Sequence, residues 1–143
     1  MIPFKTRRHK VTLGAQAVVA DSQGRVLLVR HGYRPGWHFP GGGVERDESI
    51  LTALVRELDE EAGVVLTAPP RLFGIYAHFD AFPGDHILLY VATSWQQTRV
   101  PEPNREIAEL GFFALDALPE GTTAQTRRRC AEVFSGLTPP ENW

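Results

Sequence analysis

The stretch from Gly42 to Val64 reads GGVERDESILTALVRELDEEAGV, and most of what the sequence predicts follows from it. From about Ser49 to Ala62 it contains neither glycine nor proline, the residues that most often interrupt a helix. Apolar residues recur there at helical spacing, at Leu51, Leu54, Val55, Leu58 and Ala62. Gly63 follows directly, and glycine commonly ends a helix. We therefore predict a helix over about residues 49–62.

One side of this predicted helix is acidic. At about 100° per residue, Glu57, Glu60 and Glu61 fall within an arc of roughly 100°, beside the arc of apolar residues. Carboxylates this close repel one another, and although Arg56 can reach Glu60, one guanidinium cannot neutralise three acids. Clustered carboxylate oxygens are the ligands that Mg²⁺ prefers, and bound Mg²⁺ typically bridges to substrate phosphates. The arrangement predicts a metal site for a pyrophosphate substrate; a solvated helix face is the alternative for the acids taken alone.

The segment before the helix is rich in glycine and proline. Between Gly32 and Gly43 these residues are too dense for a helix, so we predict a loop with a short strand at Trp37 to Phe39. The Gly41-Gly42-Gly43 turn lacks side chains, which allows backbone groups to approach a metal or a phosphate closely. Arg30 and Arg34 precede this turn and could bind phosphate, although a solvated role fits them equally well.

The flanking segments predict an α+β layer fold with a mixed sheet. Val11 to Ala20 and Arg25 to Arg30 are apolar and separated by a turn cluster, which predicts a β-hairpin. Further elements are predicted downstream: strands at Arg71 to Asp80, His86 to Trp95 and Leu110 to Leu115, a surface loop at Gln96 to Arg105, and a closing helix at Thr123 to Phe134. Residues 1–143 suit a single domain.

Composition excludes several classes of protein. Hydrophobic residues are 43% and charged residues 22%, which is ordinary for a globular protein. The net charge of -2 disfavours extended nucleic-acid contacts, and no apolar stretch is long enough for a membrane span. Cys130 is the single cysteine, so no internal disulfide can form. Met1 to Lys10 is basic without the apolar region of a signal peptide, so we expect a cytoplasmic protein, as a monomer or a simple homodimer.

Other aromatic and titratable residues are assigned to structure rather than to the site. His31, His38, His78 and His86 lack metal-ligand spacing, so we expect them to be structural or exposed. Five aromatic residues could stack on a base but are more simply read as core, namely Tyr33, Trp37, Tyr76, Phe79 and Phe82. Cys130 is expected to be a small core residue.

The order Gly42, five residues, Glu48, seven residues, Arg56-Glu57-Leu58-Asp59-Glu60-Glu61-Ala62-Gly63-Val64 closely resembles the box of the Nudix hydrolase family, and every fixed position is matched. Phe39 to Glu45 also looks like the family's approach to its box. The resemblance implies an α/β/α sandwich with a central mixed sheet. It also implies that a metal-activated water attacks a phosphorus atom of X-linked nucleoside diphosphates, with Mg²⁺ as cofactor and Mn²⁺ as a possible substitute.

The resemblance also implies roles for individual residues. Glu57, Glu60 and Glu61 would be metal ligands, and the Gly41 carbonyl would be a backbone ligand. Arg56 would orient a glutamate of the set, and Glu48 would support the metal shell from the start of the helix. Gly42, Arg30 and Arg34 are our candidates for binding the substrate.

The general base is left open, because it varies within the family between a box glutamate and a glutamate of a later loop. Glu106 lies six residues before Phe112, where family members often carry an acid ahead of an aromatic strand residue. Glu109 is the runner-up, and Asp80 and Asp85 are weaker candidates. A solvated loop acid is the alternative for Glu106.

The substrate is also left open. Candidates are a nucleoside triphosphate, a dinucleoside polyphosphate, and ADP-ribose or another sugar nucleotide. An enzyme acting on capped or 5'-triphosphate RNA is a further possibility, although the sequence shows no basic stripe. A catalytically silent nucleotide or metabolite sensor on the same fold is the alternative to an enzyme, and the intact box argues against it.

Overall fold

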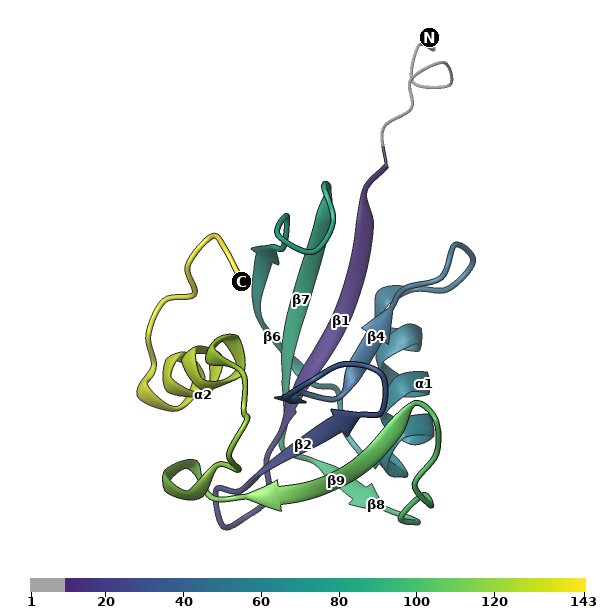
Figure 1. Ribbon diagram of the computed structural model, residues 1–143, viewed down its shortest axis with the longest axis vertical. Helices are drawn as coiled ribbons and strands as arrows, with labels where there is room; N and C mark the ends of the chain where they lie inside the picture. The colour runs from purple at the N-terminus through teal and green to yellow at the C-terminus, as the bar shows by residue number, and fades with distance from the viewer. Residues whose placement is uncertain (1–9) are drawn as a thin grey trace, which may run out of the picture.

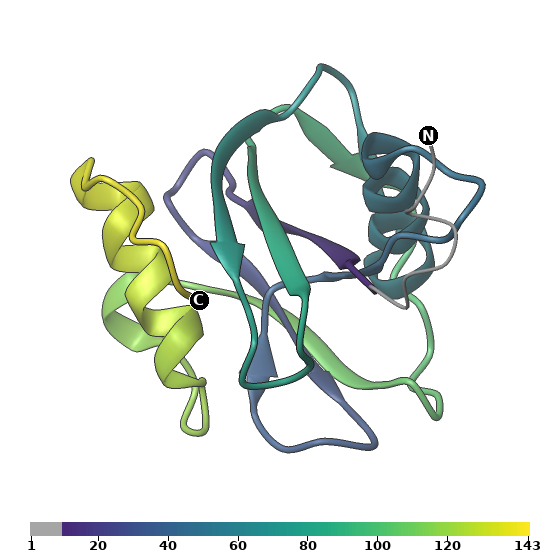
Figure 2. The ribbon, with the colours of Figure 1, turned by 90° about the horizontal axis from the view of Figure 1, so that it is seen from above.

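A computed structural model of the protein describes residues 10–143, and it has a mixed sheet between two helices (Figures 1 and 2). The central sheet has the order β4-β1-β7-β6, with β1 (Thr12–Val19) parallel to β7 (Asp85–Ala92) and the other pairs antiparallel. Its remaining strands are β4 (Gly41–Gly43) and β6 (Arg71–Ala77). The predicted α+β class with a central mixed sheet is confirmed.

Two smaller sheets complete the β structure. One has the order β3-β2-β9 and the other pairs β5 with β8, with antiparallel neighbours throughout. Their strands are β2 (Val26–His31), β3 (Trp37–His38), β5 (Val64–Leu66), β8 (Trp95–Gln97) and β9 (Ile107–Phe113). A short 3-10 turn, η2 (Leu115–Ala117), follows β9. The β5–β8 pair was not expected from the sequence.

Helices α1 (Ile50–Ala62) and α2 (Ala124–Ser135) lie on opposite sides of the strands (Figure 2). Side chains of β1 alternate between two cores: Ala15 and Ala17 pack with Leu54 and Leu58 of α1, whereas Val18 joins the core that contains Cys130 of α2. Both cores depend on the two-residue repeat of the strand. The predicted burial of Cys130 is confirmed.

Helix α1 begins and ends where the sequence predicts. Ser49 is the N-cap, and its side chain accepts a hydrogen bond from the Thr52 amide at 3.1 Å. Gly63 ends the helix with φ 63°, and its amide donates to the Asp59 carbonyl at 2.9 Å. Val55 is 45% exposed, so this residue of the predicted apolar set faces away from the core.

Two predictions about strands are wrong. β1 and β2 do not form a hairpin ladder, because β1 lies between β4 and β7 while β2 lies between β3 and β9. Only an isolated bridge, Ala20 to Val26, links the two ends among the described residues. The Gly41–Gly43 segment is also not a turn: it is strand β4, whose three residues pair with Gly14, Ala15 and Gln16.

Neither helix among residues 10–143 is long and apolar enough to cross a membrane. The expectation that the N-terminus is not a signal peptide concerns Met1 to Lys10, and residues 1–9 lie outside the described part of the chain.

Candidate active site

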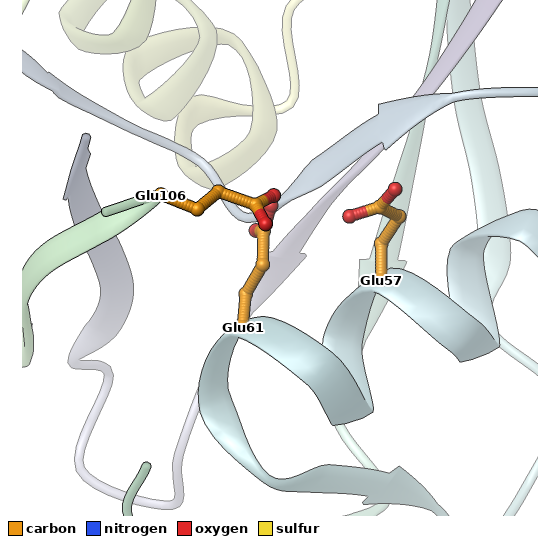
Figure 3. Close-up of side chains that lie close together, drawn as sticks. All are labelled: Glu57, Glu61 and Glu106. Atoms are coloured by element: carbon orange, nitrogen blue, oxygen red, sulfur yellow. The ribbon is translucent and has the colours of Figure 1, made fainter. Parts of the chain in front are cut away.

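Glu57 and Glu61 are buried acidic residues on the side of α1 that faces β4. Glu57 is 8% exposed and Glu61 is 2% exposed. They lie one helical turn apart, so both carboxylates point to the same side (Figure 3). The Gly41 amide donates a hydrogen bond to Oε1 of Glu61 at 3.0 Å, which fixes that carboxylate against β4.

Strand β4 consists of glycines because two close approaches leave no room for side chains. A Cβ on Gly42 would lie 2.5 Å from Oε1 of Glu57. Gly41 has φ 147°, and a Cβ there would lie within 2.7 Å of the Gln16 Cα. A Cβ on Gly43 would meet nothing within 4 Å. The first two glycines therefore let the strand lie directly against the buried acids.

Glu106 completes the cluster from a different part of the chain (Figure 3). It precedes β9, and one carboxylate oxygen from each of Glu57, Glu61 and Glu106 lies within 4.8 Å of the others. The Asn104 side chain accepts a hydrogen bond from the Glu106 amide at 2.9 Å, and the Gly32 amide donates to the Glu106 carbonyl at 3.0 Å. These bonds hold the backbone of Glu106 at the end of β2, facing α1.

Burial and mutual repulsion shift the acidity of the helix glutamates. Burial, with the nearby charges of Glu57 and Glu106, raises the pKa of Glu61 to about 9. Burial also raises the pKa of Glu57, although Arg56 opposes this. Such a cluster of carboxylates could hold a divalent metal ion, and its all-oxygen donor set fits Mg²⁺ or Mn²⁺.

Arg56 links the start of the helix to the cluster. Its Nε and Nη2 donate to the two carboxylate oxygens of Glu48, at 3.0 and 2.5 Å. Its Nη1 donates to Oε1 of Glu57 at 2.9 Å. The guanidinium lowers the pKa of Glu48, mainly through these hydrogen bonds. Glu48 thus holds Arg56, and Arg56 in turn holds Glu57.

Glu60, which the resemblance groups with the metal ligands, lies apart from the cluster. Its side chain is 55% exposed and lies 3.5 Å from Nη1 of Arg56. Helical geometry explains this, because residues four apart share one side of a helix more closely than residues three apart. Ligation by Glu60 stays a prediction that would require its side chain to turn toward Glu57.

The cluster opens into a cavity of about 500 Å³, which we call the active-site cavity. Its walls come from α1, β4 and Glu106, and Thr12, Gln16 and Asp85 line it from the central sheet. This volume is in the range of small-molecule sites. Gly41 and Gly42 line the cavity. Ligation by the Gly41 carbonyl and substrate binding by Gly42 stay predictions.

The two arginines proposed for substrate binding are placed differently. Arg34 lines the active-site cavity. Arg30 instead donates to Oε1 of Glu109 at 2.6 Å, across the β2–β9 pair, and neither residue lines the cavity. Among the candidates for the base, the structure therefore brings Glu106 to the helix acids and leaves Glu109 paired elsewhere.

His31 and His78 also line the active-site cavity, although we expected from the sequence that they would be structural or exposed. His31 is 5% exposed, and its Nδ1 has no hydrogen-bond partner among residues 10–143. Burial lowers its pKa to about 4, so the ring is neutral at pH 7. His78 is held by Asp85, 3.0 Å from Nδ1 to Oδ2. The β2–β9 pairing shifts register between Arg30 and His31, which the local sequence pattern did not reveal.

Comparisons with known proteins identify the family and the fold. The family model described as NUDIX domain matches residues 10–134. A solved structure of a MutT NUDIX hydrolase from Burkholderia pseudomallei is 34% identical, with a TM-score of 0.73 over 87% of this chain and 99% of that one. An ADP-ribose pyrophosphatase from Streptococcus suis is 27% identical, with a TM-score of 0.68 over 94% of this chain and 96% of that one.

Curated relatives resemble part of the chain. An RNA pyrophosphohydrolase from Haemophilus influenzae is 30% identical over 102 residues, which are 71% of this chain and 41% of that protein. The chain spans less than half the length of the curated relatives that it matches.

Proposed function

The chain belongs to the Nudix family, and from that premise we propose that it hydrolyses a pyrophosphate bond in a nucleoside-diphosphate-linked small molecule with the help of a divalent metal ion. One observation carries the proposal: Glu57, Glu61 and Glu106 converge within 4.8 Å at a cavity of about 500 Å³. Two of these acids are buried, an arrangement that is costly for a fold unless a cation compensates it.

We assign metal binding, orientation of Glu57 and phosphate binding to different residues of the site. Glu57 and Glu61 would hold Mg²⁺ or Mn²⁺, with Glu60 and the Gly41 carbonyl as further candidate ligands. A bound divalent cation makes water a better nucleophile and neutralises charge on the phosphates. Arg56 keeps Glu57 oriented and is itself held by Glu48. Arg34 and the backbone of β4 would contact the phosphates, since both line the active-site cavity.

Glu106 is the base that we propose for taking the proton from the attacking water. It comes from the loop before β9 rather than from α1, so it faces Glu61 across the cluster (Figure 3). Glu106 is exposed and lines the active-site cavity, so a proton that it takes can pass to solvent. A base must lie within hydrogen-bond reach of the attacking water, and a position between these carboxylates satisfies that condition.

The substrate is proposed as a class: a nucleoside triphosphate, a dinucleoside polyphosphate or a nucleotide sugar. A second candidate is the 5' end of RNA, favoured by the similarity to the Haemophilus influenzae RNA pyrophosphohydrolase. The net charge of -2 favours the small substrates, because extended RNA contacts need a basic surface. We further propose that residues 1–143 act as one domain, in the cytoplasm, as a monomer or a homodimer.

A hydrolysis screen with Mg²⁺ or Mn²⁺ tests the proposal. Nucleoside triphosphates, dinucleoside polyphosphates, nucleotide sugars and a 5'-triphosphorylated RNA oligonucleotide are offered in turn. EDTA and the variant Glu61→Gln serve as negative controls, and Glu102→Gln, at an exposed loop acid, is the matched control. We expect one EDTA-sensitive class to be preferred. A folded, metal-binding protein that hydrolyses none of them would instead support the sensor.

A further inference from the structure

A second cavity, of about 530 Å³, lies between α2, the C-terminal segment and the loop after β6; we call it the α2 cavity. Figure 2 shows the C-terminal segment running along α2 beside the sheet. Side chains of His78, Phe79, Gln125, Arg129, Asn142 and Trp143 line it. None of them belongs to the metal cluster, and the proposed chemistry uses none of them.

Arg129 is the most unusual residue of this cavity, because its guanidinium is almost fully buried. The residue is 1% exposed, and its guanidinium carbon lies 4.6 Å from the ring centre of Tyr76 and 5.1 Å from that of Trp143. Nη2 donates to Oε2 of Glu132 at 2.7 Å. Nε has no acceptor among residues 10–143. Since Nε is enclosed by protein atoms, a ligand in the cavity cannot reach it, and Arg129 contributes to the cavity by packing against the Trp143 ring.

The charges around the cavity indicate a neutral ligand. Arg128 and Arg129 are balanced by Asp80 and Glu132, so the walls have no excess positive charge with which to hold a phosphate. The remaining walls offer the amide side chains of Gln125 and Asn142 and the rings of Phe79 and Trp143. Stacking surfaces with amide donors and acceptors suit a planar heteroaromatic group such as a nucleobase.

The two cavities share a wall. His78 lines both of them. The Trp143 ring of the α2 cavity lies 6.4 Å from the His78 ring and 6.5 Å from that of Phe39, which lines the active-site cavity. A molecule whose phosphates lie at Glu57 and Glu61 could therefore extend past His78 toward α2.

We infer that the α2 cavity receives the nucleobase of the substrate, stacked against Phe79 and Trp143, with the polar edge of the base toward the amide side chains of Gln125 and Asn142. The inference rests on the proposed function for the identity of the ligand. It also places base selection on α2 and on the C-terminal segment, outside the Gly42 to Val64 stretch that carries the metal chemistry.

Kinetics of two variants in the cavity wall test the inference. Phe79 is 56% exposed, so Phe79→Ala should fold, and Gln125→Ala removes a polar wall group from α2. Since base–aromatic stacking is worth about 1–3 kcal/mol, Phe79→Ala should raise KM for the preferred nucleotide roughly 5- to 150-fold, and more than it lowers kcat. Phe82→Ala is the matched control, because Phe82 is 44% exposed in the same loop but lines neither cavity.

A base-free substrate and a binding measurement separate this inference from the proposed function. The rise in KM should be larger for the nucleotide than for inorganic triphosphate, which has no base. Calorimetry with adenosine, guanosine, cytidine and uridine in EDTA should show a nucleoside that binds the wild type and binds the two variants more weakly. Such binding without any hydrolysis would refute the proposed function and support the base site. Hydrolysis with KM unchanged in both variants, or nucleoside binding equal in all proteins, would overturn the base site alone.

Discussion

At the scale of single residues, the candidate metal site consists of two glutamates of α1 and one loop glutamate. Glu57 and Glu61 are buried four residues apart, and Glu106 reaches them from the start of β9. Burial raises the pKa of Glu61 to about 9 in the absence of metal. A carboxylate with this environment binds either a proton or a cation, and a divalent cation at neutral pH would displace the proton.

Glu61→Gln should lower kcat by at least about 100-fold while the protein stays folded. Glutamine keeps the shape of the side chain and can still accept the Gly41 hydrogen bond, but it lacks the charge that binds the cation. Steady-state kinetics with circular dichroism on the same samples measures both effects. Turnover close to that of the wild type would remove Glu61 from the site.

The metal-free protein should lose stability as the pH rises. Glu61 keeps its proton up to about pH 9 when folded but releases it near pH 4.5 when unfolded. Over this window the unfolded state binds fewer protons, so the free energy of unfolding falls with rising pH. Thermal unfolding in EDTA at pH 5 and pH 8.5 should show the decline, with a smaller one in Glu61→Gln. Added Mg²⁺ should raise Tm at pH 8.5, and equal pH slopes for both proteins would contradict the account.

Glu106→Gln should lower kcat much more than Glu109→Gln. The first residue lies at the metal cluster, whereas the second is paired with Arg30 outside the active-site cavity. The two variants are matched in chemistry and lie three positions apart. Equal and small effects on kcat would exclude Glu106 as the base.

The residue identities that sequence could predict are those with a regular spacing. The helix period places Glu57 and Glu61 on one side of α1, whereas Glu106, six residues before Phe112, is a candidate through the resemblance to the Nudix family. The sequence could not show that Glu60 would face solvent, because the three acids share one arc of about 100°. His31 and His78 line the cavity although neither belongs to a motif: His31 follows a register shift between β2 and β9, and the His78 ring is paired with Asp85 across the loop that joins β6 to β7.

At the scale of secondary structure elements, local signals predicted the helices and failed for strand partners. α1 and α2 lie within a residue or two of their predicted bounds, because caps and apolar spacing are local. β1 and β7, by contrast, pair Thr12 with Asp85 and so join distant parts of the chain. The predicted hairpin of β1 with β2 failed for this reason: alternation marks a strand but does not identify its neighbour.

The glycines of β4 allow a test of whether activity depends on the close contact between β4 and Glu57. Gly42→Ala would place a methyl group 2.5 Å from Oε1 of Glu57, so this carboxylate should move and kcat should fall roughly 10-fold or more. Gly43→Ala is the matched control, since a Cβ there meets nothing within 4 Å. Both variants should fold, as judged by Tm. Similar kcat values for the two would show that the close contact between β4 and α1 does not matter for activity.

At the scale of the whole molecule, the helices on the two sides of the central sheet have different proposed roles, metal binding and recognition of the nucleobase. α1 on one side carries the acids, and α2 on the other side carries the walls of the α2 cavity. His78 lines both cavities, and the base site that we propose requires one extended substrate to contact both. The fold is that of the Nudix family. The residues that we propose to select the base lie outside the family's box.

The net charge of -2 predicts weak salt dependence for a small substrate. Since few phosphates would be neutralised by lysine or arginine, kcat/KM for a nucleotide should change less than about 10-fold between 50 and 200 mM salt. Kinetics at these two concentrations, with Mg²⁺ held constant, measures the effect. A much steeper loss would favour the RNA candidate.

The central claim is that Glu57 and Glu61 bind a divalent metal ion beside Glu106, and Mn²⁺ binding followed by electron paramagnetic resonance tests it most directly. Wild type, Glu57→Gln, Glu61→Gln and the control Glu102→Gln are titrated at one pH. The account predicts stoichiometric binding to the wild type and the control, and an affinity at least about 10-fold lower in the two helix variants. Equal Mn²⁺ affinity in all four proteins would contradict it.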